Sequence, residues 1–430
     1  MTTYDEVLPA VVQILRENPE LHALAPVIIN RDLNGRVRLV VDAQLGSPCD
    51  MVDALKHSAS EISARVGRYA HPADRAIIVE ENFAEILSKS YAFDGNPDIR
   101  VVERLATEGS WSSISPVSQG ATRVAFFSIK GGVGRSTAMA SVAWSLAKSG
   151  KRVLVVDLDL ESPGLSSSLL PSAYRPRFGV TDWLVEDLVG NADQVFNDLV
   201  ATSPLSHDGD IFVVPAYGAD PGEYVSKLGR AWMPVLKGGI RESWSERLGR
   251  LLNDLEERLA PDIIFIDSRA GIDEVASACV TDLGAALVLL FAIDGEQTWA
   301  GYRVLFNHWR STGVARDIRD RLQVVGAVIP EDGGVEYMSL LRESSWDLFT
   351  SHLYDEVAPG ELSDVGGWSF SESDESAPHY PWPIRWQRGF SALRSLHGRL
   401  EEVDEDLVNL TFGRLIQELS LSIREVGNDA

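Results

Sequence analysis

Cysteine is scarce in this chain. Only two of its 430 residues are cysteines, Cys49 and Cys279, and they lie far apart. A disulfide framework needs several paired thiols, and a cysteine-based metal cluster needs thiols at short, regular spacing. The sequence therefore supports neither of these two kinds of stabilisation.

Long apolar runs are also missing. The longest, Leu283 to Ile293, is too short to cross a bilayer and is bounded by Asp282 and Asp294. The residues from Met1 to Glu6 have neither the basic start nor the apolar segment of a secretory signal. We therefore expect a cytoplasmic protein with no membrane attachment.

Basic residues are outnumbered by acidic ones. The chain has 39 Lys and Arg against 63 Asp and Glu, which gives a net charge of −24. Neutralising the phosphates of DNA requires clustered Lys and Arg. The balance argues against non-specific DNA binding through a broad basic face, and it favours a protein as the partner.

A strand, a glycine loop and a helix follow one another in the first half of the chain. The apolar run Val124 to Phe127 predicts a buried strand, and Arg135 to Ser149 has the apolar periodicity of a helix that ends at Gly150. The loop between them contains three glycines, whose N–H groups can surround an anion without a Cβ in the way. Such a loop before a helix N-terminus predicts a phosphate site.

The loop and the start of its helix match a family pattern. The residues are Lys130, Gly131, Gly132, Val133, Gly134, Arg135, Ser136 and Thr137. They resemble the deviant Walker A loop of the ParA/MinD family of P-loop ATPases (SIMIBI class), Lys-Gly-Gly-x-Gly-Lys-[Ser/Thr]. The resemblance implies that residues 131–137 bind ATP. It also implies that Lys130 acts in catalysis by reaching the nucleotide of a second subunit, and hence an ATP-dependent homodimer.

Arg135 stands where the family pattern has its second lysine. Arginine keeps the positive charge but replaces a compact ammonium with a wide planar group, and the two are not equivalent between closely spaced phosphates. Two interpretations stay open. The protein either hydrolyses ATP slowly or binds it without turning it over.

Three aspartates follow predicted strands near this loop. Asp157 and Asp159 end the strand after the helix, and Asp267 ends an apolar run that matches the Walker B pattern. The resemblance implies that Ser136 and Asp267 hold Mg²⁺ and that Asp157 lies near the metal and the nucleotide. It also implies that Asp159 orients or deprotonates the attacking water. Because parallel strands end at one sheet edge, we expect these side chains to lie together.

Three further expectations concern the same region. Arg269 either forms a surface ion pair or supplies charge near the γ-phosphate. Thr181 is predicted to be a helix N-cap, and the poorly periodic segment 191–210 is predicted to lie on the surface.

Apolar strands alternate with helices between residues 122 and about 400, including a predicted helix from Ile240 to Leu259 and strands at 285–291 and 323–328. This alternation predicts an α/β fold with a mostly parallel sheet covered by helices on both faces. It agrees with the P-loop NTPase fold that the resemblance implies, although the resemblance itself extends only from Arg123 to Pro330.

Residues 1–108 are predicted to form a separate small α+β domain. It begins with a helix over Tyr4 to Arg16 and a hairpin that turns at Asn34-Gly35. Further elements are expected as a helix at 51–66, a strand at 75–79, a helix at 81–88 and a strand at 99–104. No catalytic constellation is present, so we expect this domain to contact a partner or the ATPase domain. Residues 109–121 form the expected linker.

The last part of the chain has weaker patterns. An acidic insertion is expected near 355–378, where Trp368 and Phe370 either fix the segment or meet a partner. Tyr380 to Trp386 either sandwiches adenine or forms a rigid packed turn. Residues 401–430 are expected to carry a helix over 401–425, whose many acidic residues argue against binding a membrane through a basic tail.

These patterns together predict an ATP-binding switch that dimerises with ATP, hydrolyses it slowly with Mg²⁺ and acts on a protein partner. The alternative is a nucleotide-gated scaffold that binds ATP without significant hydrolysis.

Overall fold

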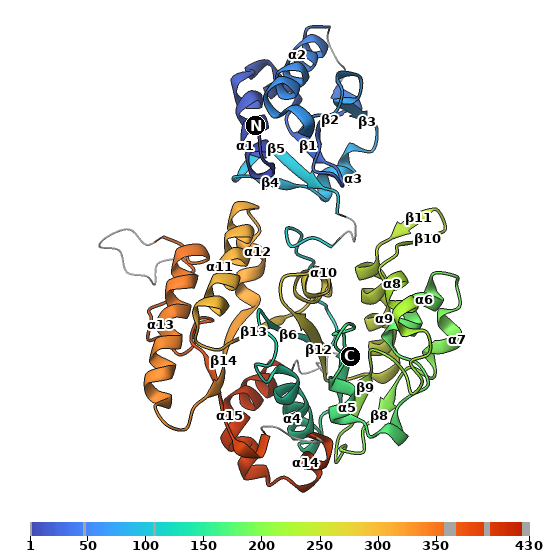
Figure 1. The fold of residues 1–430 in the computed structure, drawn as a ribbon, viewed down its shortest axis with the longest axis vertical. Helices are drawn as coiled ribbons and strands as arrows, with labels where there is room; N and C mark the ends of the chain where they lie inside the picture. Colours follow the sequence, from blue (N-terminus) through green and yellow to red (C-terminus); the bar gives the residue numbers. More distant parts are fainter. Residues whose placement is uncertain (1, 46–48, 106–108, 357–366, 391–395, 424–430) are drawn as a thin grey trace, which may run out of the picture. The chain divides into compact units, whose positions relative to one another are not determined.

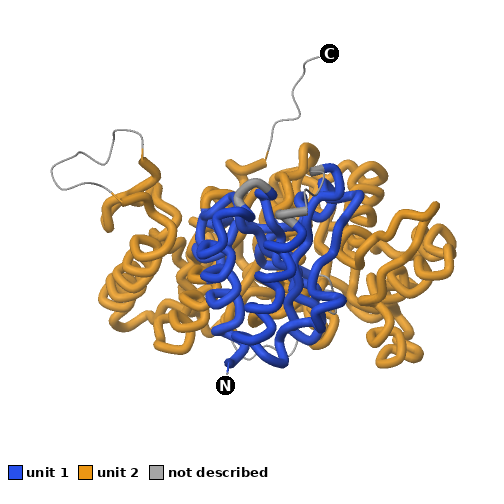
Figure 2. Tube along the Cα trace, turned by 90° about the horizontal axis from the view of Figure 1, so that it is seen from above, with its two compact units in different colours: residues 1–113, 308–315 blue, residues 114–307, 316–430 orange. Residues whose placement is uncertain are grey.

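The computed structural model describes residues 2–45, 49–105, 109–356, 367–390 and 396–423. The chain forms two compact units, which Figure 2 shows in different colours. Unit 1 comprises residues 1–113 and 308–315, and unit 2 comprises residues 114–307 and 316–430.

Unit 1 contains a five-stranded sheet with the order β3-β2-β1-β5-β4. Its strands are β1 (Val27–Arg31), β2 (Val37–Asp42), β3 (Ile77–Glu80), β4 (Tyr91–Phe93) and β5 (Asn96–Glu103). Helices α1 (Tyr4–Glu17) and α2 (Cys49–Val66) share one apolar core with the sheet, and α3 (Phe83–Ser88) packs in a second, smaller cluster. Each face of the sheet is therefore covered.

The elements predicted for unit 1 are confirmed to within a few residues. The β1–β2 pair is antiparallel, and the Asp32 carboxylate accepts hydrogen bonds from the N–H groups of Asn34 and Arg36 in its turn. Strand β4 was not predicted, because three residues are too few to show an alternation.

Unit 2 contains an eight-stranded sheet with the order β15-β14-β13-β6-β12-β7-β9-β8. All neighbouring strands are parallel except β8 and β9. Its strands are β6 (Thr122–Ser128), β7 (Val153–Asp157), β8 (Ala201–Thr202), β9 (Ile211–Val214), β12 (Ile263–Ala270), β13 (Leu287–Ala292), β14 (Leu322–Ile329) and β15 (Trp382–Arg385). The expected mostly parallel α/β fold is confirmed.

Helices lie on both sides of this sheet (Figure 1). They are α4 (Arg135–Lys148), α5 (Leu165–Leu169), α6 (Val180–Asp187), α7 (Ala192–Phe196), α8 (Tyr224–Ala231), α9 (Trp244–Leu259), α10 (Glu274–Ser277), α11 (Glu296–Ser311), α12 (Ala315–Ile318), α13 (Gly334–His352), α14 (Leu396–Glu402) and α15 (Glu405–Ser422). Of these, α11 and α12 include residues assigned to unit 1.

The apolar strands of unit 2 contribute side chains to two separate hydrophobic cores. Along β12, Phe265 packs with α4, α14 and α15, whereas its neighbours Ile264 and Ile266 pack with α6 and α9. Successive strand residues point to opposite faces. A continuous apolar run is therefore what a strand covered on both faces requires.

The structure corrects the predicted start of the helix at 240–259. Residues Ile240–Glu242 form β11, which pairs with β10 (Val235–Lys237), and α9 begins only at Trp244. The Ser243 side chain accepts the N–H of Glu246, and the Glu246 carboxylate accepts the N–H of Ser243. This reciprocal capping fixes the helix start at Ser243.

Two other local predictions in unit 2 were wrong. Thr181 is not an N-cap but lies inside α6, whose N-cap is Gly179; the Asp182 carboxylate accepts the N–H of that glycine at 2.8 Å. Segment 191–210 is not simply surface, because it contains α7 and β8 and buries Leu199 and Leu205. Apolar residues of such short elements show no period by themselves.

Two of the C-terminal predictions need changes. Tyr380 to Trp386 contains the edge strand β15, with Trp382 and Ile384 in the core, so it is not a turn. The predicted helix at 401–425 is divided between α14 and α15, since Asp404 caps the latter and its side chain accepts the N–H of Asp406. Residues 424 and 425 lie outside the described residues.

Part of the acidic insertion, residues 357–366, also lies outside the described residues. In the part that follows, the Trp368 ring packs on Tyr354 with 5.2 Å between centroids, and the Arg319 guanidinium lies 4.6 Å from its centroid. Phe370 packs against both rings. Of the two alternatives, the structure supports aromatics that fix the segment.

Candidate functional site

The predicted phosphate loop joins the end of β6 to the start of α4. Val133 points into the core and is 4% exposed, which anchors the loop. Gly132 and Gly134 have φ values of +75° and +80°, where residues with a Cβ are strained. A Cβ built on either would meet no atom within 4 Å, so the glycines serve the backbone conformation and leave open space above the loop.

The sheet order brings the predicted acidic residues to this loop. Strand β12 lies between β6 and β7, and Asp267 is in register with Asp157. Both carboxylates are buried, with exposed fractions of 1% and 0%. The N–H of Leu158, which opens the loop after β7, donates to the Asp267 carbonyl oxygen at 3.0 Å. The carboxyl ends of three strands therefore build one site.

Arg135 occupies the centre of the site. Its side chain is buried, and its Nε–H donates to Asp267 Oδ1 at 2.7 Å. One Nη1–H donates to Ser128 Oγ at 2.8 Å, and Nη2 lies 3.6 Å from Asp159 Oδ2. The guanidinium thus connects the last residue of β6 with a carboxylate within β12, that of Asp267, and with one that follows β7, that of Asp159.

Ser136 and Asp267 are the two residues expected to hold Mg²⁺. The Ser136 hydroxyl donates to Asp267 Oδ2 at 2.9 Å. A hydroxyl and a carboxylate are oxygen ligands of the kind that Mg²⁺ accepts, with water and phosphate completing its octahedron. The donor set fits the metal, but Arg135 already engages the other oxygen of Asp267. Among the described residues no group of three His, Cys, Asp or Glu could hold a metal, so Mg²⁺ here would depend on nucleotide oxygens.

Asp159 lies at the edge of the same cluster. Its carboxylate accepts the N–H of Ser162 at 3.2 Å, and its own N–H donates to Asp157 Oδ1 at 3.2 Å. Burial raises the pKa of the Asp159 carboxyl; the positive charge of Arg135 opposes this rise and the negative charge of Asp267 adds to it. Asp159 therefore takes up a proton more readily than an ordinary aspartate.

Lys130 and Thr137 lie on the loop and the helix but outside this cluster. Lys130 is half-buried and forms no hydrogen bond or ion pair with any residue that the structure describes. Thr137 lies in the first turn of α4, where its carbonyl oxygen accepts the hydroxyl of Ser141 at 2.8 Å. Arg135, Asp159 and Asp267 thus meet within one chain, whereas the Lys130 ammonium has no partner in the described part of it.

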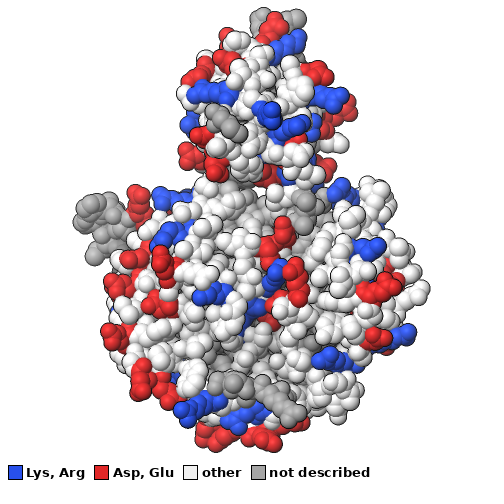
Figure 3. Space-filling model, in the orientation of Figure 1, with Lys and Arg blue, Asp and Glu red and all other residues white. Residues whose placement is uncertain are grey.

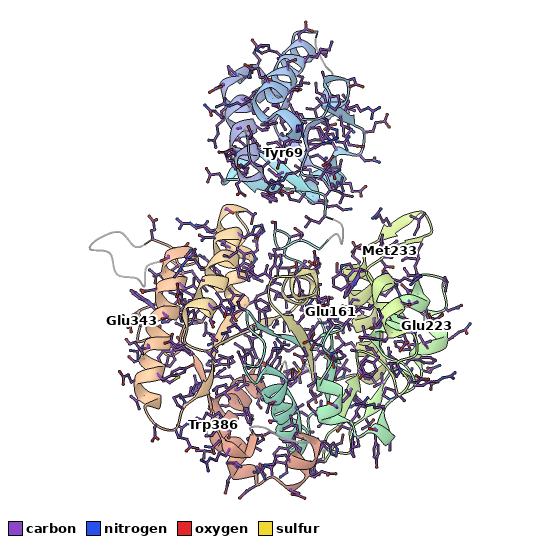
Figure 4. The ribbon with its side chains drawn as sticks, viewed as in Figure 1. Tyr69, Glu161, Glu223, Met233, Glu343 and Trp386 are labelled. Carbon is purple, nitrogen blue, oxygen red and sulfur yellow. The ribbon has the colours of Figure 1, made fainter. Side chains whose placement is uncertain are left out.

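Arg269 forms a surface ion pair, in accordance with one of its two predicted roles. Its guanidinium lies 2.8 Å from Glu161 and 3.5 Å from Asp273, and its side chain is 35% exposed. Figure 4 labels Glu161, which comes from the loop after β7. The pair therefore ties that loop to the segment after β12.

Sequence reasoning missed two residues near the site. Ser128, the strand residue that fixes one end of the Arg135 guanidinium, is fully buried. Tyr224 of α8 donates its hydroxyl to the carbonyl oxygen of Leu160 at 2.6 Å and so holds the loop after β7. The signal for Ser128 was a polar residue at the end of an apolar strand, whereas nothing near Tyr224 in the sequence pointed to that loop.

One face of unit 2 carries both signs of charge (Figure 3). On the face of unit 2 shown in Figure 3, acidic and basic side chains are interspersed, and the described basic residues form no continuous patch there. Within the described segments, every helix is too short or too polar to cross a membrane.

Comparison with known proteins identifies the second unit. Residues 124–339, half of the chain, match the family described as the CobQ/CobB/MinD/ParA nucleotide binding domain. No curated protein matches the chain.

Several solved structures are similar to the chain. One is pNOB8 ParA bound to nonspecific DNA, with 17% identity over 70% of this chain and 97% of that chain and a TM-score of 0.43. A second is the cell division ATPase MinD of Pyrococcus furiosus, with 19% identity over 70% and 99% and a TM-score of 0.43. A third is the Cyanothece McdA–ATP complex, with 14% identity over 72% and 100% and a TM-score of 0.41.

Proposed function

The chain belongs to the CobQ/CobB/MinD/ParA family of nucleotide-binding domains, and from this premise we propose that it is an ATP-dependent dimerising switch with slow, Mg²⁺-dependent hydrolysis. The observation that carries the proposal is the position of Ser136 and Asp267, 2.9 Å apart beside an open glycine loop. A phosphate site and a hydroxyl–carboxylate pair thus meet at the carboxyl edge of a parallel sheet, where ligands bind in such folds.

Each predicted site residue has a proposed role. The N–H groups of residues 131–134 and the start of α4, including Thr137, bind the phosphates of ATP. Ser136 and Asp267 would hold Mg²⁺, and the metal would supply positive charge beside the phosphates. Asp157 supports this metal site, and Asp159 positions the attacking water.

Lys130 has a proposed role between two copies of the chain. Its ammonium has no partner among the described residues of its own chain. We propose that it contacts the nucleotide of a second copy, so that ATP joins the two. A lysine acting across the interface makes dimerisation depend on the triphosphate.

A second candidate function follows from the contacts of Arg135. Its ion pair with Asp267 engages the carboxylate that the hydrolysis mechanism needs for Mg²⁺. Because Arg135 engages this carboxylate, the contact favours the second function, a scaffold that binds ATP and dimerises but does not release phosphate. The presence of Asp159 beside it favours the hydrolysing switch.

The net charge of −24 supports a protein partner over non-specific DNA, and we propose that the protein acts on it in the cytoplasm. We propose that residues 1–108 act as a partner-binding domain, that 109–121 act as a linker, and that 122–400 form the nucleotide-binding domain, followed by the helical segment 401–430.

The function is tested by measuring particle mass by light scattering while phosphate release is followed in the same sample. The protein is examined with Mg²⁺ and ATP, with ADP and without nucleotide, and Lys130→Ala is the control. Dimers with ATP, monomers with ADP and slow phosphate release support the switch. Dimers without phosphate release support the scaffold, and a mass that never responds to nucleotide contradicts both.

A further inference from the structure

The guanidinium of Arg135 is held by protein groups on three sides. Asp267, Ser128 and Asp159 surround it, and the side chain is only 7% exposed. A lysine at this position would present all its donors from one nitrogen atom, whereas the guanidinium spreads five N–H groups over three nitrogens. The arrangement therefore depends on arginine and not only on positive charge.

The Arg135 contacts change what Asp267 can do. Arg135 binds its Oδ1 and Ser136 binds its Oδ2. A divalent cation that took Asp267 as a ligand would have to displace one of these contacts, and the 2.7 Å bond to Arg135 is charge-assisted and buried. The arginine thus competes directly with a metal for this carboxylate.

The Arg135 guanidinium also retains donors for a ligand. Of its five N–H groups, two donate to Asp267 and Ser128, and Nη2 lies at ion-pair distance from Asp159 without a hydrogen bond. These remaining N–H groups come from the first residue of α4, directly after the glycine loop. Arginine is suited to phosphate oxygens because its planar group can donate two hydrogen bonds at once.

We propose that Arg135 is a built-in cation that takes the place of Mg²⁺ beside Asp267, so that the site binds a nucleoside triphosphate without the divalent metal. The inference rests on the proposed nucleotide site. It removes the metal requirement for binding the nucleotide and leaves Mg²⁺, which would have to displace the Arg135 contact to Asp267, to the hydrolysis step alone. In this arrangement Ser128 is a positioning residue, because it fixes the guanidinium that faces the phosphates.

The test is the affinity for ATP, measured by calorimetry on the full chain in excess EDTA and in excess Mg²⁺. We expect Mg²⁺ to change the wild-type Kd by less than about threefold, because the cation position is already filled. Arg135→Lys frees Asp267 for the metal and should make binding at least about tenfold tighter with Mg²⁺ than with EDTA. Ser128→Ala should raise the ratio of the Kd in EDTA to the Kd in Mg²⁺ as well, by a smaller factor.

Arg414→Lys is the matched control, because Arg414 forms an exposed pair with Glu418 on α15. It should keep the wild-type Kd ratio. A second readout is Mn²⁺ binding without nucleotide, followed by electron paramagnetic resonance, which should be weak in the wild type and stronger in Arg135→Lys.

The outcomes separate this inference from the proposed function. A wild-type protein that binds ATP tightly only with Mg²⁺ overturns the inference and leaves the switch intact. If Arg135→Lys unfolds, the wild-type ratio and the Ser128→Ala ratio still decide the question. Failure of the wild type to bind ATP in either buffer refutes the proposed function itself.

Discussion

Replacing Arg135 with methionine should destabilise the protein. The variant leaves Asp267, which is 1% exposed, without its cation and with the Ser136 hydroxyl in place of its former two side-chain donors. Removing one partner of a buried ion pair typically costs about 3–5 kcal/mol. The second contact, to Asp159 at 3.6 Å, is longer and its carboxylate is 17% exposed, so it adds little. We therefore expect a loss of about 3 kcal/mol at neutral pH, at the lower end of that range.

The loss should be visible in the melting temperature. For large domains about 1 kcal/mol corresponds to roughly 2 °C, so Arg135→Met should melt about 6 °C below the wild type in scanning calorimetry of the full chain. Arg414→Met, which removes an exposed pair with Glu418, should melt within about 1 °C of it. Equal melting temperatures for Arg135→Met and the wild type would refute the view that the ion pair stabilises the site.

The pH dependence gives an independent check. Because the folded-state pKa of Asp159 is raised, its contribution to stability is present at low pH and is lost as pH rises through that pKa. Removing Arg135 takes away the charge that opposes the rise. The loss of unfolding free energy caused by Arg135→Met should therefore become smaller as the pH is lowered from neutral into the acidic range. A loss that becomes larger would contradict the view that Arg135 stabilises the ionised carboxylates.

Three further predictions concern single residues. Asp159→Ala should bind ATP with a Kd within about twofold of wild type but release phosphate at least about a hundredfold more slowly; normal release would rule out its proposed role. Lys130→Ala should remain monomeric with ATP in light scattering, and an unchanged dimer would remove the lysine from the interface. Burial raises the pKa of Asp282 to about 6, so the wild type should lose stability as pH rises through that value. Asp282→Asn should abolish this loss and raise the free energy of unfolding at alkaline pH by about 3 kcal/mol, because a pKa raised from 3.8 to about 6 corresponds to roughly 1.4 kcal/mol per unit; a wild-type-like pH profile of the variant would contradict this.

Most of the fold was predictable because its strands are buried on both faces. Runs such as Val153–Asp157 are almost wholly apolar, and a glycine or an aspartate marks their ends. The hairpin β10–β11 and the strand β15 were not predictable in the same way. They have three or four residues each, and packing against neighbours rather than periodicity decides their conformation.

The residues of the candidate site were predictable from motifs, but their contacts were not. Spacing alone placed Arg135 and Asp267 near one loop. Whether the guanidinium points to phosphates or to Asp267 depends on Ser128 and on the register of β12 with β6 and β7, which bring these groups within reach. Such tertiary distances are not encoded in any local pattern of the chain.

The two outermost strands of the large sheet limit how copies of the protein can associate. At one edge β8 has only two residues. At the other edge the N–H of Trp386 donates to Ile329 of β14, so by alternation the N–H positions of residues 381 and 383 face outward, and both residues are prolines. Neither edge offers a row of free backbone donors for another strand. Self-association through this part of the molecule must therefore join side-chain surfaces and cannot extend the eight-stranded sheet from one copy into the next.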